Sequence, residues 1–376
     1  MGGWHEAAKS LLERRLAAAG VRLDGGRPWD IQTHRPRFVR RVLWGGSLAF
    51  GESYMAGDWE AADLEELFFR LLRAGLERRP AFSPGALWRG LRASLFNAQT
   101  PRRAGHVGRR HYDLGNELFA AMLDRRRVYS CGYWRDADDL EAAQEAKLDL
   151  ICRKLGLQPG MRLLDIGCGF GSLLFYAAER YGVIGHGITV SRRQAEWARE
   201  HNSGLPVTIE IRDYRSLPAA SYDRVVSVGM VEHVGWRNYR AFMNTAAERL
   251  AAGGLFLLHT IGSNTSVRQT DPWIAKYIFP NSNLPSLAQL ARAAENLLLL
   301  DDLHSFGPDY TLTLRAWYRR FTAAWPKLSA IYDETFRRMW SYYLQISAAA
   351  FRAGHIQLWQ LLFSKAPRNV IAETVR

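Results

Sequence analysis

A glycine-rich stretch near the middle of the chain is the clearest ligand-binding pattern in the sequence. Asp165 ends an apolar run, and Gly167, Gly169 and Gly171 follow it before a helical pattern begins. Glycines let a backbone turn tightly and approach a ligand closely, and parallel sheets bind ligands in the crevice beyond their strand ends. A dinucleotide-binding loop would place glycine at position 172, where the chain has Ser172. The spacing therefore disfavours a dinucleotide, and an ordinary strand-to-helix turn is the simpler alternative.

Three further side chains have the chemistry of an acid, a base or a hydrogen-bond donor. Glu232 follows an apolar segment, His259 ends another, and Tyr310 lies in a Phe-Gly-Pro-Asp-Tyr sequence. Each has an ordinary structural explanation when taken alone. Glu232 suits the positive end of a helix, His259 suits a buried strand end, and Tyr310 suits simple packing.

The three cysteines give no metal-binding pattern. Cys131, Cys152 and Cys168 contain no C-x-x-C pair. This usage favours a reducing compartment, and we expect no structural metal site.

The elements that must position these residues follow from periodicity. Residues 5–20 and 60–98 are typical of helices, while residues 21–60 read as small strands and turns with Gly-Gly punctuation. From residue 140, apolar strand-like runs alternate with helical ones, which predicts an α/β fold with a parallel, doubly wound sheet. Residues 265–350 break this alternation and are interpreted as a helical and aromatic cap over the ligand crevice. We place an N-terminal domain at 1–98, a basic connector at 99–125 and a catalytic domain at 126–376.

Composition and charge limit the function classes. The chain has 376 residues, enough for two domains, and a net charge of +13. Residues 1–110 carry 19 basic against 11 acidic side chains, so much of the excess lies there. A basic patch suits nucleic acid or anionic lipid headgroups, although an arginine-rich solvated surface is equally compatible. No apolar run reaches the roughly 18 residues of a membrane span, and the charged N-terminus does not resemble a signal peptide.

The glycine loop resembles motif I of class I S-adenosylmethionine (SAM) methyltransferases. Most of these enzymes grip the ribose with an acidic residue after the second strand. The corresponding segment here contains Thr189 and Val190, with Gln194 further on, and one lipid-acting branch uses Thr and Gln instead. Asp213 and Tyr214, after the third strand, are placed to meet the adenine. Tyr129 and Ser130 complete the cofactor-binding set that the resemblance implies.

Longer motifs make the resemblance more specific. Gly51-Glu52-Ser53-Tyr54-Met55, His111-Tyr112-Asp113-Leu114-Gly115-Asn116, Tyr129-Ser130-Cys131-Gly132-Tyr133-Trp134, Glu232-His233-Val234-Gly235, His259-Thr260-Ile261-Gly262-Ser263 and Ile356-Gln357-Leu358-Trp359 are similar to segments of the cyclopropane-fatty-acyl-phospholipid synthase family. The likeness covers nearly the whole chain and includes the small N-terminal lipid-binding domain of the bacterial two-domain type.

The resemblance implies a reaction and a second bound group. In this family a cis alkene of a phospholipid acyl chain attacks the methyl group of SAM, and a bound bicarbonate removes a proton before the ring closes. The matching bicarbonate ligands are Cys131 and Ile261 through their backbones, and Glu232, His259 and Tyr310 through their side chains. Aromatic faces that could stabilise the cation belong to Tyr133, Trp134, Phe170, Tyr277 and Tyr310.

One position departs from the family pattern. Some accounts of the family place a catalytic cysteine in a late helix, where this chain has Ser347. Because the other site residues are intact, we favour a non-covalent mechanism over an inactive enzyme.

The resemblance also implies where the protein works. We expect a cytoplasmic homodimer, peripherally bound to the inner face of a membrane and favouring anionic lipid. The apolar residues Trp44, Phe50, Trp59, Phe68, Phe69 and Trp88 could contact lipid or form the domain core. The alternatives are a methyl- or methylene-forming enzyme of the same family, a nucleic-acid methyltransferase and a non-catalytic binding protein. Nucleic acid is not an expected partner, because Glu232-His233-Val234-Gly235 replaces the usual Asn/Asp-Pro-Pro-Tyr loop.

Overall fold

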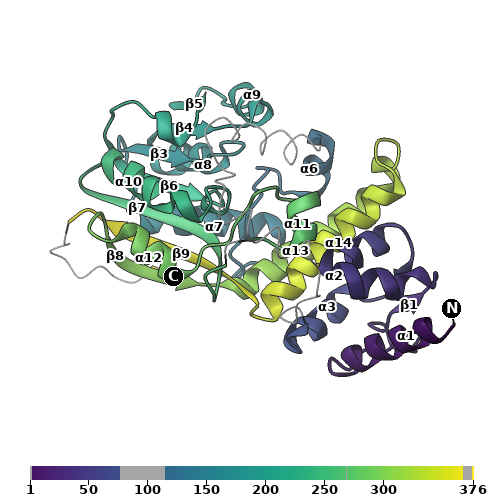
Figure 1. Cartoon of the computed structure of the whole chain (residues 1–376). Helices are drawn as coiled ribbons and strands as arrows, with labels where there is room; N and C mark the ends of the chain where they lie inside the picture. The colour runs from purple at the N-terminus through teal and green to yellow at the C-terminus, as the bar shows by residue number, and fades with distance from the viewer. Residues whose placement is uncertain (1, 77–114, 268, 367–374) are drawn as a thin grey trace.

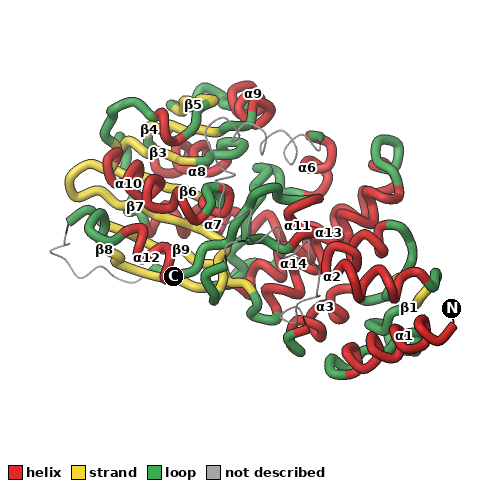
Figure 2. The backbone as a smooth tube through the Cα atoms, in the orientation of Figure 1, coloured by secondary structure: helices red, strands yellow, loops and turns green. Residues whose placement is uncertain are grey.

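The protein is built around a seven-stranded mixed sheet with the order β5-β4-β3-β6-β7-β9-β8. The computed structural model describes residues 2–76, 115–267, 269–366 and 375–376. The strands are β3 (Arg162–Ile166), β4 (Ile184–Thr189), β5 (Val207–Ile211), β6 (Tyr222–Val228), β7 (Leu250–Ser263), β8 (Leu299–Ser305) and β9 (Ile356–Ser364). β3 to β7 are mutually parallel, whereas β9 runs antiparallel to both β7 and β8. Figure 2 shows these strands in yellow with red helices packed around them.

Helices cover both faces of this sheet, as the strand–helix alternation predicts. Neighbouring residues of β3 point to opposite faces, so Leu163 and Leu164 belong to different apolar clusters. The Leu163 side is covered by α7 (Leu140–Lys154), α8 (Ser172–Tyr181) and α9 (Arg192–Glu200), and the Leu164 side by α10 (Tyr239–Arg249) and α12 (Leu287–Ala294). Burial on both faces explains why these strands are nearly continuous apolar runs.

The segment interpreted as a cap is more complex than expected. It contains α11 (Pro272–Tyr277), α12, α13 (Gly307–Leu328) and most of α14 (Glu334–Arg352), but β8 lies in its middle. The apolar run Leu297–Leu300 leads into β8, which pairs with β9 as the sheet edge. The prediction of a parallel, doubly wound sheet is confirmed for β3 to β7, and β8 and β9 extend it with antiparallel pairs. The interpretation of 265–350 as a purely helical and aromatic cap is wrong, because β8 lies within that segment.

The N-terminal region is more helical than its glycines suggested. It contains α1 (Gly2–Ala17), α2 (Arg37–Met55) and α3 (Leu64–Arg73), with only the two-residue strands β1 (Gln32–Thr33) and β2 (Trp59–Glu60). Gly46 has φ 57° and ψ −141°, so it kinks α2 without ending it. The prediction of mainly strands and turns over 21–60 is wrong, because α2 continues through the kink at Gly46. The expected helix from 60 is confirmed as far as α3, and residues 77–98 lie outside the described residues.

The N-terminal helices share one apolar core with α13 and α14. Figure 1 shows α2 and α3 beside α14, on the side away from the sheet. Phe68 meets the ring of Tyr342 edge-on at 5.0 Å, and Tyr54 lies 5.6 Å from the same ring. Ion pairs at the margin join Glu52 to Lys276 and Glu65 to Arg315.

This shared core corrects part of the lipid-facing set. Phe50, Trp59 and Phe68 are buried in it, so they form core and cannot contact lipid in this arrangement. Phe69 is half-buried, Trp44 is exposed, and Trp88 lies outside the described residues. Among the described residues, no helix is both long and apolar enough to cross a membrane.

The junction between α2 and α11 should be sensitive to one added methyl group. A Cβ atom on Gly51 would lie 2.4 Å from Cδ1 of the buried Trp273. We expect Gly51→Ala to lower the free energy of unfolding by about 1–3 kcal/mol, because overpacking outweighs the gain in helix propensity. Urea denaturation followed by circular dichroism would measure this. Gly26→Ala, where a Cβ meets nothing within 4 Å, is the matched control. Equal stability of the two variants would contradict the tight junction.

Candidate active site

A cavity opens where β3, β4 and β6 end, and most residues of the predicted cofactor set line it. The lining residues from that set are Tyr129, Ser130, Asp165, Gly167, Gly169, Thr189, Val190, Gln194, Asp213 and Tyr214. Gly171 instead begins α8 as its N-cap, with φ 78°. A Cβ atom on Gly167, whose φ is 93°, would lie 2.6 Å from Met230, so this turn requires glycine both sterically and conformationally.

The polar groups beyond β4 and β5 are partly satisfied by one another. The Thr189 hydroxyl donates to Oε1 of Gln194 at 3.3 Å, which joins the end of β4 to the first turn of α9. Burial alone would raise the pKa of Asp213, but hydrogen bonds from Arg215 outweigh it and lower the pKa. The buried Tyr214 hydroxyl has no partner among the described residues. This edge thus offers a carboxylate, an amide and hydroxyls to a ribose or an adenine.

Two buried groups of opposite charge face the same cavity. Burial raises the pKa of Asp165 to about 7, and the Lys147 charge partly offsets this. Burial likewise lowers the pKa of Lys147 to about 8, and its ammonium donates to the Ser130 hydroxyl at 2.8 Å. Oδ1 of Asp165 has no partner among the described residues. The methionyl end of SAM carries one ammonium and one carboxylate, so this pair fits it.

Sequence analysis missed Lys147 and His233, which also line this cavity. Lys147 looks like one more charged residue of α7, although the apolar Ala143, Ala146 and Leu148 around it hint at a buried face. Burial lowers the pKa of His233 to about 4, so its imidazole is neutral. Its position directly after Glu232 was the available signal.

The affinity for SAM should have a bell-shaped pH dependence. Below about pH 7 Asp165 gains a proton, and above about pH 8 Lys147 loses one, so SAM binding should weaken in both directions. We expect Lys147→Met to reduce SAM affinity about 10–100-fold near pH 7.5, as fits a lost charged hydrogen bond, and to make the alkaline limb shallower, because only the α-amino group of SAM then loses a proton there. Calorimetric titration from pH 6 to 9 would measure this. Arg153→Met, an exposed change on the same helix, is the control, and an affinity and an alkaline limb in Lys147→Met equal to those of the wild type would refute the assignment.

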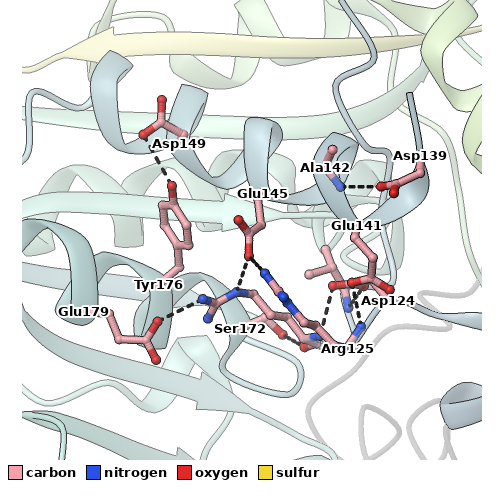
Figure 3. Close-up of polar contacts among 12 residues, drawn as sticks. Asp124, Arg125, Asp139, Glu141, Ala142, Glu145, Asp149, Ser172, Tyr176 and Glu179 are labelled. Carbon is pink, nitrogen blue, oxygen red and sulfur yellow. Dashed lines mark hydrogen bonds and ion pairs between the residues drawn. The ribbon is translucent and has the colours of Figure 1, made fainter. Parts of the chain in front are cut away.

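The loop that carries Tyr129 and Ser130 into the cavity is held by a polar network (Figure 3). The Asp124 carboxylate accepts the amide N–H groups of Arg126 at 3.0 Å and Val128 at 2.8 Å. The Ser172 hydroxyl at the start of α8 donates to the Arg126 carbonyl, and the Arg126 guanidinium reaches Glu179 at 2.9 Å. Arg127, between these anchors, has φ 56°. The network therefore fixes an otherwise unfavourable turn against the glycine loop.

A second group of predicted residues lies outside the lining of this cavity. Oε1 of Glu232 accepts the Ile261 amide N–H at 2.7 Å, and Oε2 has no partner among the described residues. Burial raises the pKa of Glu232 to about 7. Nδ1 of His259 lies 3.3 Å from Nε2 of Gln360, while Nε2 of His259 has no partner in the described part of the chain. Two buried polar atoms thus have unused hydrogen-bonding capacity.

Cys131 and Tyr310 are brought together by α13. The amide of Gly132 donates to Oγ1 of Thr313 at 3.0 Å, and the amide of Trp134 donates to the Asp309 carboxylate at 2.7 Å. Tyr310 lies between these two residues of α13 and stacks on Phe351 at 4.6 Å. Burial raises the pKa of the Cys131 thiol, which suits a backbone role better than a thiolate role.

None of the five predicted anion ligands lines the cavity, although Ser130 and His233, which are next to Cys131 and Glu232 in the sequence, do. The amide N–H of Ile261, one of the five, donates to Glu232 at 2.7 Å. An anion contacting that amide would have to share the hydrogen, so its main effect here is to orient Glu232.

The aromatic side chains predicted to stabilise the cation lie in different parts of the structure. Phe170 lines the cavity, and Tyr133 packs edge-on against Phe306 at 5.4 Å. Trp134 donates its indole N–H to Thr313, whereas the Tyr277 hydroxyl donates to Glu52 of α2. Ser347 is half-buried on α14. His111 to Leu114 lie outside the described residues, while Gly115 caps α6 (Asn116–Met122).

Gln360 fixes the tautomer of His259. An amide nitrogen can only donate, so Nδ1 of the neutral His259 is the acceptor and Nε2 carries the hydrogen. Gln360 is fully buried and faces His259 in the β7–β9 register, but sequence reasoning missed it because glutamine on a strand carries no motif. Nε2–H of His259 is therefore a hydrogen-bond donor without an acceptor among the described residues.

Removing this amide should change the histidine tautomer. In Gln360→Met, which keeps the volume, we expect the ¹⁵N chemical shifts of His259 to move toward a mixture of tautomers, because Nδ1 loses its donor. Histidine-labelled NMR would measure this, with Gln357→Met on the same strand as control. Unchanged His259 shifts in Gln360→Met would show that another group sets the tautomer.

The sheet order, the glycine loop and the cavity at the strand ends together define a class I SAM-dependent methyltransferase. The chain belongs to the family described as mycolic acid cyclopropane synthetase, whose model matches residues 99–361.

Relatives extend this match to nearly the whole chain. The chain is 50% identical over 366 residues to cyclopropane-fatty-acyl-phospholipid synthase of Escherichia coli K12, covering 97% of this chain and 94% of the relative. It is 34% identical to tuberculostearic acid methyltransferase UfaA1 of Mycobacterium tuberculosis, covering 87% and 81%.

Solved structures agree. Cyclopropane synthase MmaA2 of M. tuberculosis has TM-score 0.66 and 31% identity, covering 72% of this chain and all of that one. Mycolic acid cyclopropane synthase CmaA1, complexed with SAH and CTAB, has TM-score 0.65 and 34% identity, covering 69% and 98%.

Proposed function

We propose that the protein transfers a methylene group from SAM to the cis double bond of unsaturated acyl chains in membrane phospholipids, forming a cyclopropane ring. The observation that carries this is the 50% identity to the E. coli enzyme over 97% of the chain. That alignment includes the N-terminal region, whereas the family model begins at residue 99. Similarity through the catalytic half alone would not distinguish a phospholipid substrate from other lipids.

In this proposal the residues of the crevice position SAM and exclude water. Lys147 and Asp165 would hold the methionyl end, Thr189 and Gln194 the ribose, and Asp213 the adenine. An alkene is a poor nucleophile, so fixed orientation at close range must supply much of the rate. The methyl group would then face the region of Cys131 and Tyr310.

The second group behind the cavity fits a small oxyanion. Nε2–H of His259 is a buried donor without a partner among the described residues, and Oε2 of Glu232 is a buried acceptor without one. A bicarbonate ion has both an acceptor oxygen for the imidazole and a hydroxyl for the carboxylate. Bound there, it would supply the base that removes the proton. Glu232 and His259 would hold and orient it, with the Cys131 backbone and Tyr310 as further donors.

A methyl- or methylene-forming reaction is the second candidate. The 34% identity to a tuberculostearic acid methyltransferase over 87% of the chain favours it specifically. The methylene product would arise from the same cation if a hydride first shifts from the methyl-bearing carbon to the cationic carbon and the transferred methyl group then loses its proton, so the position of the base relative to the cation decides between the two products. Reduction of that methylene to a methyl branch would need a separate hydride donor.

The N-terminal domain, residues 1–98, is proposed to hold the membrane, with 99–125 as connector and 126–376 as catalytic domain. A homodimer on the cytoplasmic face of the membrane would place two such domains on one surface. The arginine-rich composition of this region supports attraction to anionic lipid.

Mass spectrometry of acyl chains would test the reaction. The protein is incubated with SAM and vesicles of unsaturated anionic phospholipid, with and without bicarbonate. We expect a gain of one CH₂ unit with loss of the double bond, suppressed when bicarbonate is removed. A gain that keeps an alkene would favour the second candidate, and no gain while SAM still binds would refute both.

Glu232→Gln tests the oxyanion site in the same assay. The wild-type rate should rise with pH through about 7 at fixed bicarbonate, because the carboxylate form accepts the bicarbonate hydroxyl. The variant keeps the shape but donates where it should accept, so we expect about a 100-fold lower rate without this pH dependence. Glu248→Gln, an exposed change on α10, is the control. A variant rate that still depends on bicarbonate as in the wild type would contradict the site.

A further inference from the structure

Trp44 has the most exposed large apolar side chain among the described residues, with 71% of its surface accessible. It lies on α2 immediately before Gly45 and the Gly46 kink. Its neighbours Val42 and Leu43 are half-buried and pack against the apolar core, whereas Trp44 does not. An exposed indole leaves a large apolar surface in water, so contact with an apolar partner beyond the described residues would stabilise it.

Trp44 shares one helical face with three arginines. Arg37, Arg40, Arg41 and Trp44 recur at the three- and four-residue spacing that aligns side chains along a helix. The opposite side of this half of α2 carries Phe38 and Val39, which are buried. The first half of α2 therefore presents a basic stripe that ends in an indole.

The positive charge of this stripe is only partly neutralised. Asp58 is fully buried and accepts hydrogen bonds from Arg37 and Arg41 at 2.8–3.0 Å. Arg40 is exposed and forms no ion pair among the described residues. Arg35, also exposed, lies 3.8 Å from the same carboxylate. Arg41 also lies 3.7 Å from Glu52. The buried Asp58, together with Glu52, thus orders Arg35, Arg37 and Arg41, while Arg40 keeps its full charge.

The second half of α2 contacts α11, which belongs to the segment interpreted as a cap. Gly51 packs on Trp273 of α11, and Glu52 accepts hydrogen bonds from Lys276 and Tyr277 of the same helix. The stripe and the cap are therefore joined through one kinked helix.

We propose that the Arg37–Trp44 face of α2 is a membrane-docking surface, in which the indole enters the headgroup layer and the arginines contact anionic phospholipid headgroups. This rests on the proposed phospholipid substrate. Indoles favour the membrane interface, and guanidinium groups bind phosphates in bidentate fashion. A second copy of the chain is a poorer occupant, because a symmetric contact would bring the two Arg40 side chains together.

Vesicle co-sedimentation without SAM would test this surface. For vesicles of phosphatidylglycerol and phosphatidylcholine, we expect Trp44→Ser to weaken binding about tenfold, since it removes a large interfacial side chain. Arg40→Gln should weaken it about fivefold on these vesicles and have no effect on pure phosphatidylcholine. Ile331→Ser, which alters another exposed apolar residue between α13 and α14, is the control and should bind as wild type. Unchanged SAM affinity in every variant verifies the fold.

A second measurement reports whether position 44 enters the headgroup layer. The three native cysteines are buried, so Trp44→Cys provides one exposed thiol among the described residues for a polarity-sensitive dye. We expect its emission to shift to the blue on anionic vesicles. Equal vesicle binding by Trp44→Ser and wild type would overturn the proposal. So would a changed oligomeric mass of Trp44→Ser in lipid-free buffer, or stronger binding of wild type to single-stranded DNA than to vesicles. Docking that depends on Trp44 without cyclopropane formation would instead refute only the proposed reaction.

Discussion

Three ionisable side chains are buried at the carboxyl edge of the sheet with hydrogen-bonding capacity that the described residues do not fill. Asp165 faces the cavity, and Glu232 and His259 lie outside its lining. Each unsatisfied buried group costs about 1–3 kcal/mol, so folding alone does not favour this arrangement. Bound ligands would recover that cost, which means that the same atoms that weaken the ligand-free protein define what it binds.

The rest of the structure keeps these groups in place. Parallel strands bring Asp165, Glu232 and His259 to one edge, because they end β3, follow β6 and lie in β7 respectively. The antiparallel strand β9 adds Gln360 beside His259. α13 holds the Cys131 loop through Asp309 and Thr313. Neither β9 nor α13 belongs to the alternating part of the fold, yet both support the second site.

The N-terminal helices carry the surface that we propose docks on the membrane. Most of their described aromatic side chains pack in or against the core shared with α14, whereas the side chain of Trp44 is exposed. The kink at Gly46 separates a basic outer half of α2 from an inner half that contacts α11. The proposed membrane-docking face and the contact with α11 are thus carried by one helix.

The sequence by itself determined the strand–helix alternation and the glycine loop, because these depend on local periodicity and on turns that only glycine permits. The family motifs added a predicted set of cofactor-binding residues. Ten of the eleven predicted cofactor residues line one cavity. The family motifs likewise indicated Glu232, His259, Cys131, Ile261 and Tyr310 as a set.

Only the tertiary structure decided which partners these residues have. Lys147 and Gln360 are ordinary by type and spacing, and burial beside Ser130 and His259 is what gives them significance. Ile261 proved to orient Glu232, and β8 emerged within a segment that reads as helical. The split of the N-terminal aromatics into core and exposed surface was also undecidable from sequence, because burial is set by contacts between segments hundreds of residues apart. Local sequence patterns determine which helices and strands form. Long-range packing determines how deeply a side chain is buried and which groups surround it, and these set its pKa and reactivity.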